Sequence, residues 1–138
     1  MRSGKKMAKC IVFAANRGYA IASSRTILVK RFLDAGWRVI LVTSDDKHTR
    51  KLIALGAELE PVNFKRGGFD LFADWNAYKE LRAIFRKHMP EAVHFFHAKP
   101  IILGSRAAKK ELGDDIKVFA TITGLGQAFT NGSIAKHL

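Results

Sequence analysis

The chain has few of the residues that cross-link a fold or bind metals. Its 138 residues include one cysteine, Cys10, so no disulfide can form within the chain. No group of cysteines and histidines has the spacing of a zinc site. Cys10 stands in the apolar run 10–13, where a small buried hydrophobe is a more common role than a nucleophile. No apolar run approaches the roughly 20 residues that cross a bilayer. These absences predict a cytoplasmic protein that binds no metal.

Acidic residues are also scarce. Lysine and arginine number 24 against 12 aspartates and glutamates, which gives a net charge of +12. Such a surface attracts a polyanion: nucleic acid, an anionic membrane or a phosphorylated ligand. Charge alone does not choose among these partners. We expect residues 1–8 to form a basic flexible tail, and not a signal peptide, because no sufficiently long apolar region follows them.

Apolar runs alternate with amphipathic segments along the rest of the chain. Strands are predicted at 9–15, 38–43, 57–62, 92–96 and 116–121, and helices at about 21–35, from Asp45 and Asp46 to Leu55, at 75–88 and at 101–112. Pro61 indicates an edge position for the third strand, and a further helix is predicted from Ser133. The alternating order predicts an α/β fold, a Rossmann-like doubly wound parallel sheet in three α/β/α layers. Residues 9–138 then form one domain.

The loop after the first strand is the first candidate site. In a doubly wound sheet, ligands bind where loops leave the carboxyl ends of the strands. We expect Asn16, Gly18 and Tyr19 to contact a substrate there, with glycine allowing close approach of the backbone. Arg25, in the following helix, is a candidate phosphate ligand. Neither G-x-G-x-x-G nor G-x-x-x-x-G-K-[ST] occurs, which argues against a dinucleotide oxidoreductase or a P-loop NTPase.

The loop after the fourth strand is the second candidate site. Strand alternation places His94 and Phe96 on one face, and Phe95 and His97 on the other. His97 falls at the carboxyl end, where it could donate to an oxyanion or sugar hydroxyl or carry a proton, so it is the candidate catalytic residue. We interpret His94 as structural. Lys99 follows at the mouth of the crevice, where a cation favours phosphate.

Three further segments carry weaker indications. Thr123, Gly124 and Gly126 form a tight loop after the fifth strand, with backbone amides suited to an anion or a sugar hydroxyl. Residues 65–68 are interpreted as a solvated loop, with a mobile lid or a membrane-facing loop as the alternative. Cations of the helix at 75–88 could contact anionic lipid, namely Arg82, Arg86 and Lys87.

Five pieces of the chain, in this order, resemble a known family. They are the loop 16–19, Arg25, D-A-G-W-R-V-I-L-V-T at 34–43, F-H-A-K-P-I-I-L-G-S-R-A-A at 96–108 and T-G-L-G-Q-A-F at 123–129. The chain resembles the N-terminal, acceptor-side half of a retaining GT-B glycosyltransferase of the family 4 kind. It is most similar to bacterial enzymes that extend lipid-linked sugars for capsule, O-antigen or protein glycans.

The resemblance implies a domain that binds a polyprenyl-diphosphate-linked saccharide at an anionic membrane surface, on the cytoplasmic side. The co-substrate of the full enzyme would be a nucleotide sugar, with UDP-sugar expected, bound mainly by a second domain. This domain would hold no cofactor. The family's E-x7-E donor-side pair is not in these 138 residues, so the donor-binding domain is expected outside this chain. Thr123 also stands where many family members have histidine.

Two alternatives differ in class. The first is the acceptor-binding domain just described, which alone would be inactive and would not bind nucleic acid. The second is a basic Rossmann-like module that binds nucleic acid or another anion without catalysis, which the net charge supports. Against the second, aromatic residues do not gather with cations on an obvious strand face.

Overall fold

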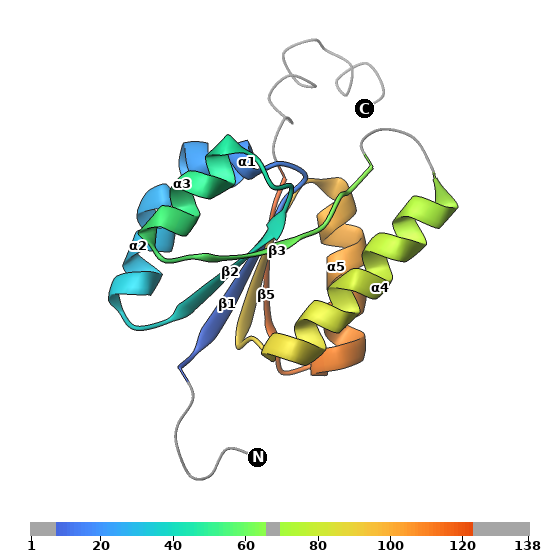
Figure 1. Cartoon of the computed structure of the whole chain (residues 1–138). Helices are drawn as coiled ribbons and strands as arrows, with labels where there is room; N and C mark the ends of the chain where they lie inside the picture. Colours follow the sequence, from blue (N-terminus) through green and yellow to red (C-terminus); the bar gives the residue numbers. More distant parts are fainter. Residues whose placement is uncertain (1–7, 66–69, 123–138) are drawn as a thin grey trace, which may run out of the picture.

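The structure is a three-layer α/β/α sandwich (Figure 1). The computed structural model describes residues 8–65 and 70–122. Five parallel strands lie in the order β3-β2-β1-β4-β5. The elements are β1 (Cys10–Ala14), α1 (Gly18–Ser24), α2 (Thr26–Asp34), β2 (Arg38–Thr43), α3 (Lys47–Leu55), β3 (Glu58–Pro61), α4 (Leu71–His88), β4 (Ala92–Phe96), α5 (Ala98–Leu112) and β5 (Lys117–Thr121). The predicted fold class is confirmed.

Each face of the sheet has its own hydrophobic core. Alternate residues of the central strand point to opposite faces, so Phe13 joins one core and Val12 the other. The core on the side of α1, α2 and α3 includes Ile21, Val29 and Leu52. The core on the side of α4 and α5 is built by Ala77, Leu81, Phe85, Phe95 and Ala107, among others. The predicted helices on both faces are thus observed.

The predicted helix at 21–35 is in fact two helices. Arg25 lies between α1 and α2 with φ −126° and ψ 9°, outside the helical range. The hydroxyls on either side donate to carbonyls one turn back, Ser24 to Ala20 at 3.0 Å and Thr26 to Ala22 at 2.6 Å. Such bonds bend helices. A pattern of apolar residues does not register this break, because both helices keep their apolar side on the sheet.

Two other helices begin earlier than expected. α4 starts at Leu71, where we expected Trp75, because the Asp70 carboxylate accepts from the Ala73 N–H at 3.0 Å and caps the helix. α5 starts at Ala98, so Pro100 lies within its first turn, where the missing N–H is tolerated. The helix α3 lies within the predicted segment; Asp46 caps it, and Gly56, with φ 121°, ends it. β3 is an edge strand, as Pro61 indicated.

Some expectations lie outside the described residues. These are most of the basic tail, residues 66–68 of the loop at 65–68, Thr123, Gly124, Gly126 and the helix from Ser133. Across residues 8–65 and 70–122, no helix is long and apolar enough to cross a membrane.

Candidate functional site

A small pocket lies where β1 and β4 end. Its volume is about 270 Å³. The loop after β1 and the first turns of α1 form most of its lining, and His97 completes it; the lining residues are Arg17, Tyr19, Ala20, Ser23, Ser24 and His97. Two loops that are far apart in the sequence therefore meet in one pocket, at the edge of the sheet where parallel α/β folds bind ligands.

His97 is held by the loop after β1. Its backbone lies in the left-handed region, with φ 72°, at the N-cap of α5. The Asn16 N–H donates to Nδ1 of the His97 ring at 3.2 Å. We expected His97 to share a face with Phe95, but the positive φ ends the strand alternation and the ring lines the pocket beside α1. A non-glycine residue with positive φ is uncommon and is found disproportionately at functional sites.

The bond from Asn16 determines what the His97 ring can do. A ring nitrogen that accepts a hydrogen bond carries no proton, so in the neutral ring the proton is on Nε2. His97 in this tautomer is a hydrogen-bond donor through Nε2, suited to a sugar hydroxyl or a developing oxyanion. The geometry favours this role over that of a general base.

Asn16 itself contributes through its backbone. Its side-chain Oδ1 is buried and has no hydrogen-bond partner among the described residues. Leaving a buried acceptor unpaired costs about 1–3 kcal/mol. The predicted substrate contact by Asn16 is thus compatible with the position of this oxygen, and it stays a prediction.

Gly18 has a packing role between α1 and α3. Its N–H donates to Oδ2 of Asp46 at 3.2 Å. A Cβ at Gly18 would lie 2.5 Å from Cγ2 of Thr49 and 2.7 Å from Oδ1 of Asp46. The glycine therefore allows α1 to approach α3 closely, and its expected contact with a ligand stays a prediction. Its neighbour Tyr19 is 56% exposed and lines the pocket.

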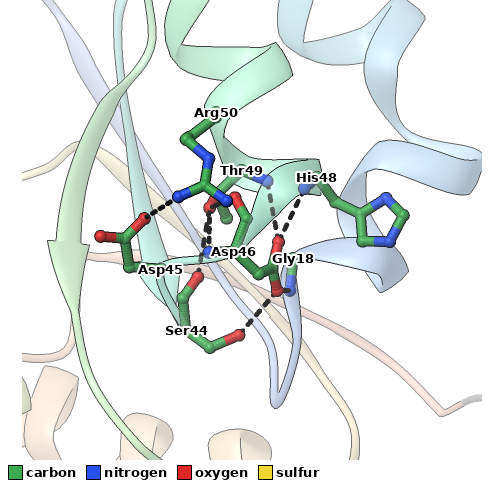
Figure 2. A network of polar contacts seen from close by, with 7 residues as sticks. All are labelled: Gly18, Ser44, Asp45, Asp46, His48, Thr49 and Arg50. Carbon is green, nitrogen blue, oxygen red and sulfur yellow. Dashed lines mark hydrogen bonds and ion pairs between the residues drawn. The ribbon is translucent and has the colours of Figure 1, made fainter.

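Asp46 is the centre of a polar network that joins α1 to α3 (Figure 2). One carboxylate oxygen accepts from the N–H groups of His48 and Thr49, and the other accepts from Ser44 Oγ and the Gly18 N–H. Burial raises the pKa of the Asp46 carboxyl, but the four hydrogen bonds outweigh burial and hold the pKa below its ordinary value.

Arg25 lies over the end of β4. Its guanidinium is 5.4 Å from the centre of the Phe96 ring, in a cation–π contact, and it donates to the Ser24 carbonyl at 3.1 Å. Ser24 lines the pocket, so the charge of Arg25 is next to it. Arg25 was expected inside a helix and instead lies at the junction of two.

His94 lies beneath this arginine and is structural in its contacts. Its ring stacks on Phe96 at 4.3 Å, and its Nε2 is 2.8 Å from Oγ1 of Thr121. Burial and then the positive charge of Arg25 lower the pKa of His94, which favours the neutral ring.

Lys99 points away from the pocket. Its Nζ forms an ion pair with Oδ1 of Asp74 at 2.9 Å, and both side chains are only 20% exposed. This bond joins the first turn of α5 to the first turn of α4. The structure thus engages Lys99 between two helices, and its predicted contact with substrate phosphate would require the ion pair to open.

A second, larger groove runs between α4 and α5. Its volume is about 490 Å³, and its lining includes Trp75, Tyr78, Leu103 and Arg106. The rings of Trp75 and Tyr78 stack at 5.5 Å. At the start of α4, Leu71 is 79% exposed and Phe72 is 85% exposed. We name Leu71, Phe72 and Trp75 the α4 ridge.

The cations chosen from the sequence on α4 are all paired. Arg82 and Arg86 bind the Glu111 carboxylate at 2.8 Å and 2.7 Å, and Lys87 binds Glu60 at 3.0 Å. The hydrogen bonds from Arg86 and then Arg82 lower the pKa of Glu111 to about 2. Arg17 and Arg25, by contrast, have no carboxylate partner among the described residues.

Sequence reasoning missed four contributors to the pocket and its support: Arg17, Ser23, Ser24 and Asp46. The serines could have been found, because Ser23 lies one turn after Tyr19 on the same side of α1. Asp46 was recognised only as a cap of α3. In the described part of the chain, no group of three or more His, Cys, Asp or Glu side chains could hold a metal ion.

Comparison with known structures supports the fold. MurG of Acinetobacter baumannii superposes with a TM-score of 0.66 at 18% identity, covering 93% of this chain and 39% of MurG. The calicheamicin glycosyltransferase CalG4 gives 0.65 at 16% identity, covering 92% of this chain and 38% of CalG4. The UDP-GlcNAc 2-epimerase of Neisseria meningitidis gives 0.54 at 15% identity, covering 81% and 31%. The chain thus spans about two fifths of both glycosyltransferases and has the Rossmann-like fold of half of a GT-B enzyme.

Comparison with curated proteins gave no match. A family model, by contrast, matches nearly the whole chain. It is described as glycosyl transferase 4-like, and it covers residues 7–135. Because this match extends well beyond half of the 138 residues, the chain belongs to the glycosyl transferase 4-like family.

Proposed function

We propose that this chain is the acceptor-binding domain of a retaining glycosyltransferase. The enzyme would transfer a sugar from a nucleotide sugar, with a UDP-sugar as the expected donor, to a polyprenyl-diphosphate-linked saccharide in bacterial surface polysaccharide or glycan synthesis. The observation that carries the proposal is the pocket at the ends of β1 and β4. There His97 and two serines meet a cation, Arg17, that has no carboxylate partner among the described residues.

Different residues at the pocket suit different parts of an acceptor. Ser23, Ser24 and the Nε2–H of His97 suit sugar hydroxyls, which both donate and accept hydrogen bonds. Arg17 and Arg25 suit the diphosphate, because a guanidinium forms paired bonds with phosphate oxygens. Tyr19 offers an exposed ring edge at the rim. Orienting one hydroxyl toward the donor is the main contribution that such a domain can make to rate.

The donor would bind mainly to a second domain. The chain covers 38% and 39% of the two glycosyltransferases compared above, and its sequence contains no E-x7-E pair of the donor-side kind. Stabilisation of the leaving nucleoside diphosphate is therefore assigned to that domain. Thr123, Gly124 and Gly126 remain predicted acceptor contacts.

The α4 ridge would dock on the cytoplasmic face of an anionic membrane. Leu71, Phe72 and Trp75 are large, exposed and grouped at the start of α4, which follows the carboxyl end of β3. Tryptophan is favoured at the membrane–water interface, and nearby cations add about 1 kcal/mol each. Because Arg82, Arg86 and Lys87 are paired, the apolar ridge and Arg106 replace them as the proposed lipid contacts.

An assay of sugar transfer and vesicle binding tests the proposal. The 138-residue chain is expected to bind phosphatidylglycerol vesicles in a salt-sensitive way, to bind phosphatidylcholine vesicles weakly, and to show no transfer alone. Adding the donor domain is expected to restore transfer to a short-chain prenyl-diphosphate saccharide. Transfer by the 138-residue chain alone would overturn the two-domain proposal. Tight RNA or DNA binding with equal affinity for both vesicles would favour the binding-module alternative.

A further inference from the structure

The pocket wall that carries Tyr19 depends on a residue outside the pocket. Asp46 belongs to the turn between β2 and α3, yet its carboxylate contacts both helices that flank this wall (Figure 2). Oδ1 accepts from His48 and Thr49 at 2.9 and 3.0 Å, and Oδ2 accepts from Gly18 at 3.2 Å. A single side chain thus caps α3 and holds the first residue of α1.

The surrounding contacts leave Asp46 little freedom. Ser44 Oγ donates to Oδ2 at 2.9 Å, and the Asp46 N–H donates to Oγ1 of Thr49 at 2.9 Å, which completes a capping box. Thr49 is fully buried, and Gly18 lies against it with no room for a Cβ. The separation of α1 and α3 is therefore set by this carboxylate and this glycine together.

The fixed position of α1 reaches the pocket through Tyr19. Tyr19 follows Gly18 directly, and its ring meets the His48 ring edge to face at 5.1 Å. His48 is itself bonded to Asp46 through its N–H. Both the backbone and the ring of Tyr19 are thus located by groups that Asp46 holds.

We propose that Asp46 is a positioning residue that sets the Tyr19 wall of the pocket by holding the first turn of α1 against the first turn of α3. Its carboxylate also engages the amides of Gly18, His48 and Thr49. These amides are therefore not offered to a ligand, and the anionic part of a ligand is left to Arg17 and Arg25. The consequence for acceptor binding rests on the proposed function, whereas the placement of Tyr19 does not.

Fluorine NMR can test the placement directly, because the chain has two tyrosines, Tyr19 and Tyr78. In protein labelled with 3-fluorotyrosine, Asp46→Asn keeps an oxygen for the α3 amides but turns an NH₂ group toward the Gly18 N–H. The expected result is a displaced or broadened Tyr19 resonance and an unchanged Tyr78 resonance. Asp46→Ala is expected to displace Tyr19 further, and added formate, which restores a carboxylate, is expected to reverse part of the change.

Asp45→Asn is the matched control, since it removes the same charge from an exposed neighbour whose one ion pair among the described residues is with Arg50, at 3.9 Å. It is expected to leave both resonances in place. An unchanged Tyr19 resonance in folded Asp46→Asn would overturn the proposal. If Asp46→Asn loses both native resonances, Ser44→Ala, which removes one of the four donors, must displace Tyr19 alone, and its failure to do so also overturns the proposal.

The link to function has a separate readout. In the transfer assay described above, Asp46→Asn is expected to raise the KM for the acceptor on the order of tenfold with a smaller effect on kcat. An unchanged KM with a displaced Tyr19 resonance would contradict the link and leave the placement intact. If the wild-type chain together with the donor domain shows no transfer to any acceptor, the proposed function itself is contradicted.

Discussion

The arginines and the lysine that join α4 to α5 differ in their partners from the two arginines at or beside the pocket. On the face of α4 and α5, three ion pairs join one helix to the other. They are formed by Arg82, Arg86 and Lys99, each with a carboxylate on the other helix. On the face of α1, Arg17 lines the pocket and Arg25 binds the carbonyl of Ser24, and neither has a carboxylate partner among the described residues. The net charge of +12 does not distinguish these roles. A cation that lies beside a pocket and has no acidic neighbour is a better candidate for a ligand contact than a cation in an ion pair.

Removing an arginine that has no carboxylate partner tests most directly whether position matters more than charge. Arg25→Ala is expected to lower the affinity for inorganic pyrophosphate or a prenyl-diphosphate saccharide by about 10- to 100-fold, the equivalent of one charge-assisted contact. Arg86→Ala removes the same charge from a paired position and is expected to change affinity little. Isothermal titration calorimetry of both variants measures the difference. Equal losses would show that overall charge, and not position, governs binding.

The two glycines of close approach give the next largest effect. A Cβ at Gly104 would lie 2.3 Å from Cε1 of Phe95, and one at Gly18 would lie 2.5 Å from Cγ2 of Thr49. We expect Gly104→Ala and Gly18→Ala each to reduce the free energy of unfolding by about 1–3 kcal/mol. Urea unfolding measures these losses.

The same two substitutions distinguish an effect on stability from an effect on acceptor binding. The lack of a side chain at Gly104 lets α5 pack closely on β4, away from the pocket. Folded Gly104→Ala is therefore expected to keep its affinity for the acceptor. Gly18→Ala moves the wall that carries Tyr19 and is expected to weaken binding as well. A Gly104→Ala protein that is fully folded but does not bind would contradict the assignment of the pocket to the α1 side.

The ion pairs of α4 and α5 predict a pH dependence. The folded pKa of Glu111 is held at about 2 by Arg86 and Arg82, below the unfolded value of about 4.3. The stabilisation by ionised Glu111 is therefore full above about pH 4.3 and is lost as the pH falls toward 2. The difference in unfolding free energy between the wild type and Glu111→Gln is expected to stay constant down to about pH 4.3 and to shrink below it. A difference that vanishes near neutral pH would contradict this ion pair.

Cys10 gives the smallest expected effect. Burial raises the pKa of its thiol to about 11, so the thiol is neutral at ordinary pH, and its side chain is buried in β1. Ellman's reagent is expected to react with it only after unfolding, and Cys10→Ser or Cys10→Ala is expected to leave acceptor affinity unchanged. Rapid reaction in the native protein would show that β1 opens.

The sequence was a good guide to strands and a weaker guide to contacts between loops. β2 and β4 matched their predicted limits, because buried parallel strands are continuous apolar runs bounded by polar residues. The break at Arg25 was missed because it depends on hydroxyl-to-carbonyl bonds from Ser24 and Thr26, which leave the apolar pattern intact.

The candidate site was also predicted only in part. The placement of loops at the carboxyl ends of strands follows from topology, so the loop at 16–19 and His97 were found together. The bond from Lys99 to Asp74 and the bond from the Gly18 N–H to Asp46 join residues 25 and 28 positions apart. No local pattern encodes such contacts, and they required the folded structure.

The measurement that most directly tests the central claim is NMR mapping of the two substrates on ¹⁵N-labelled protein. Addition of a short-chain prenyl-diphosphate saccharide is expected to shift the amide resonances of Arg17, Tyr19, Ser24 and His97, whereas a UDP-sugar at the same concentration leaves them in place. Shifts at these residues caused by the UDP-sugar and not by the saccharide would contradict the account, and would assign this pocket to the donor.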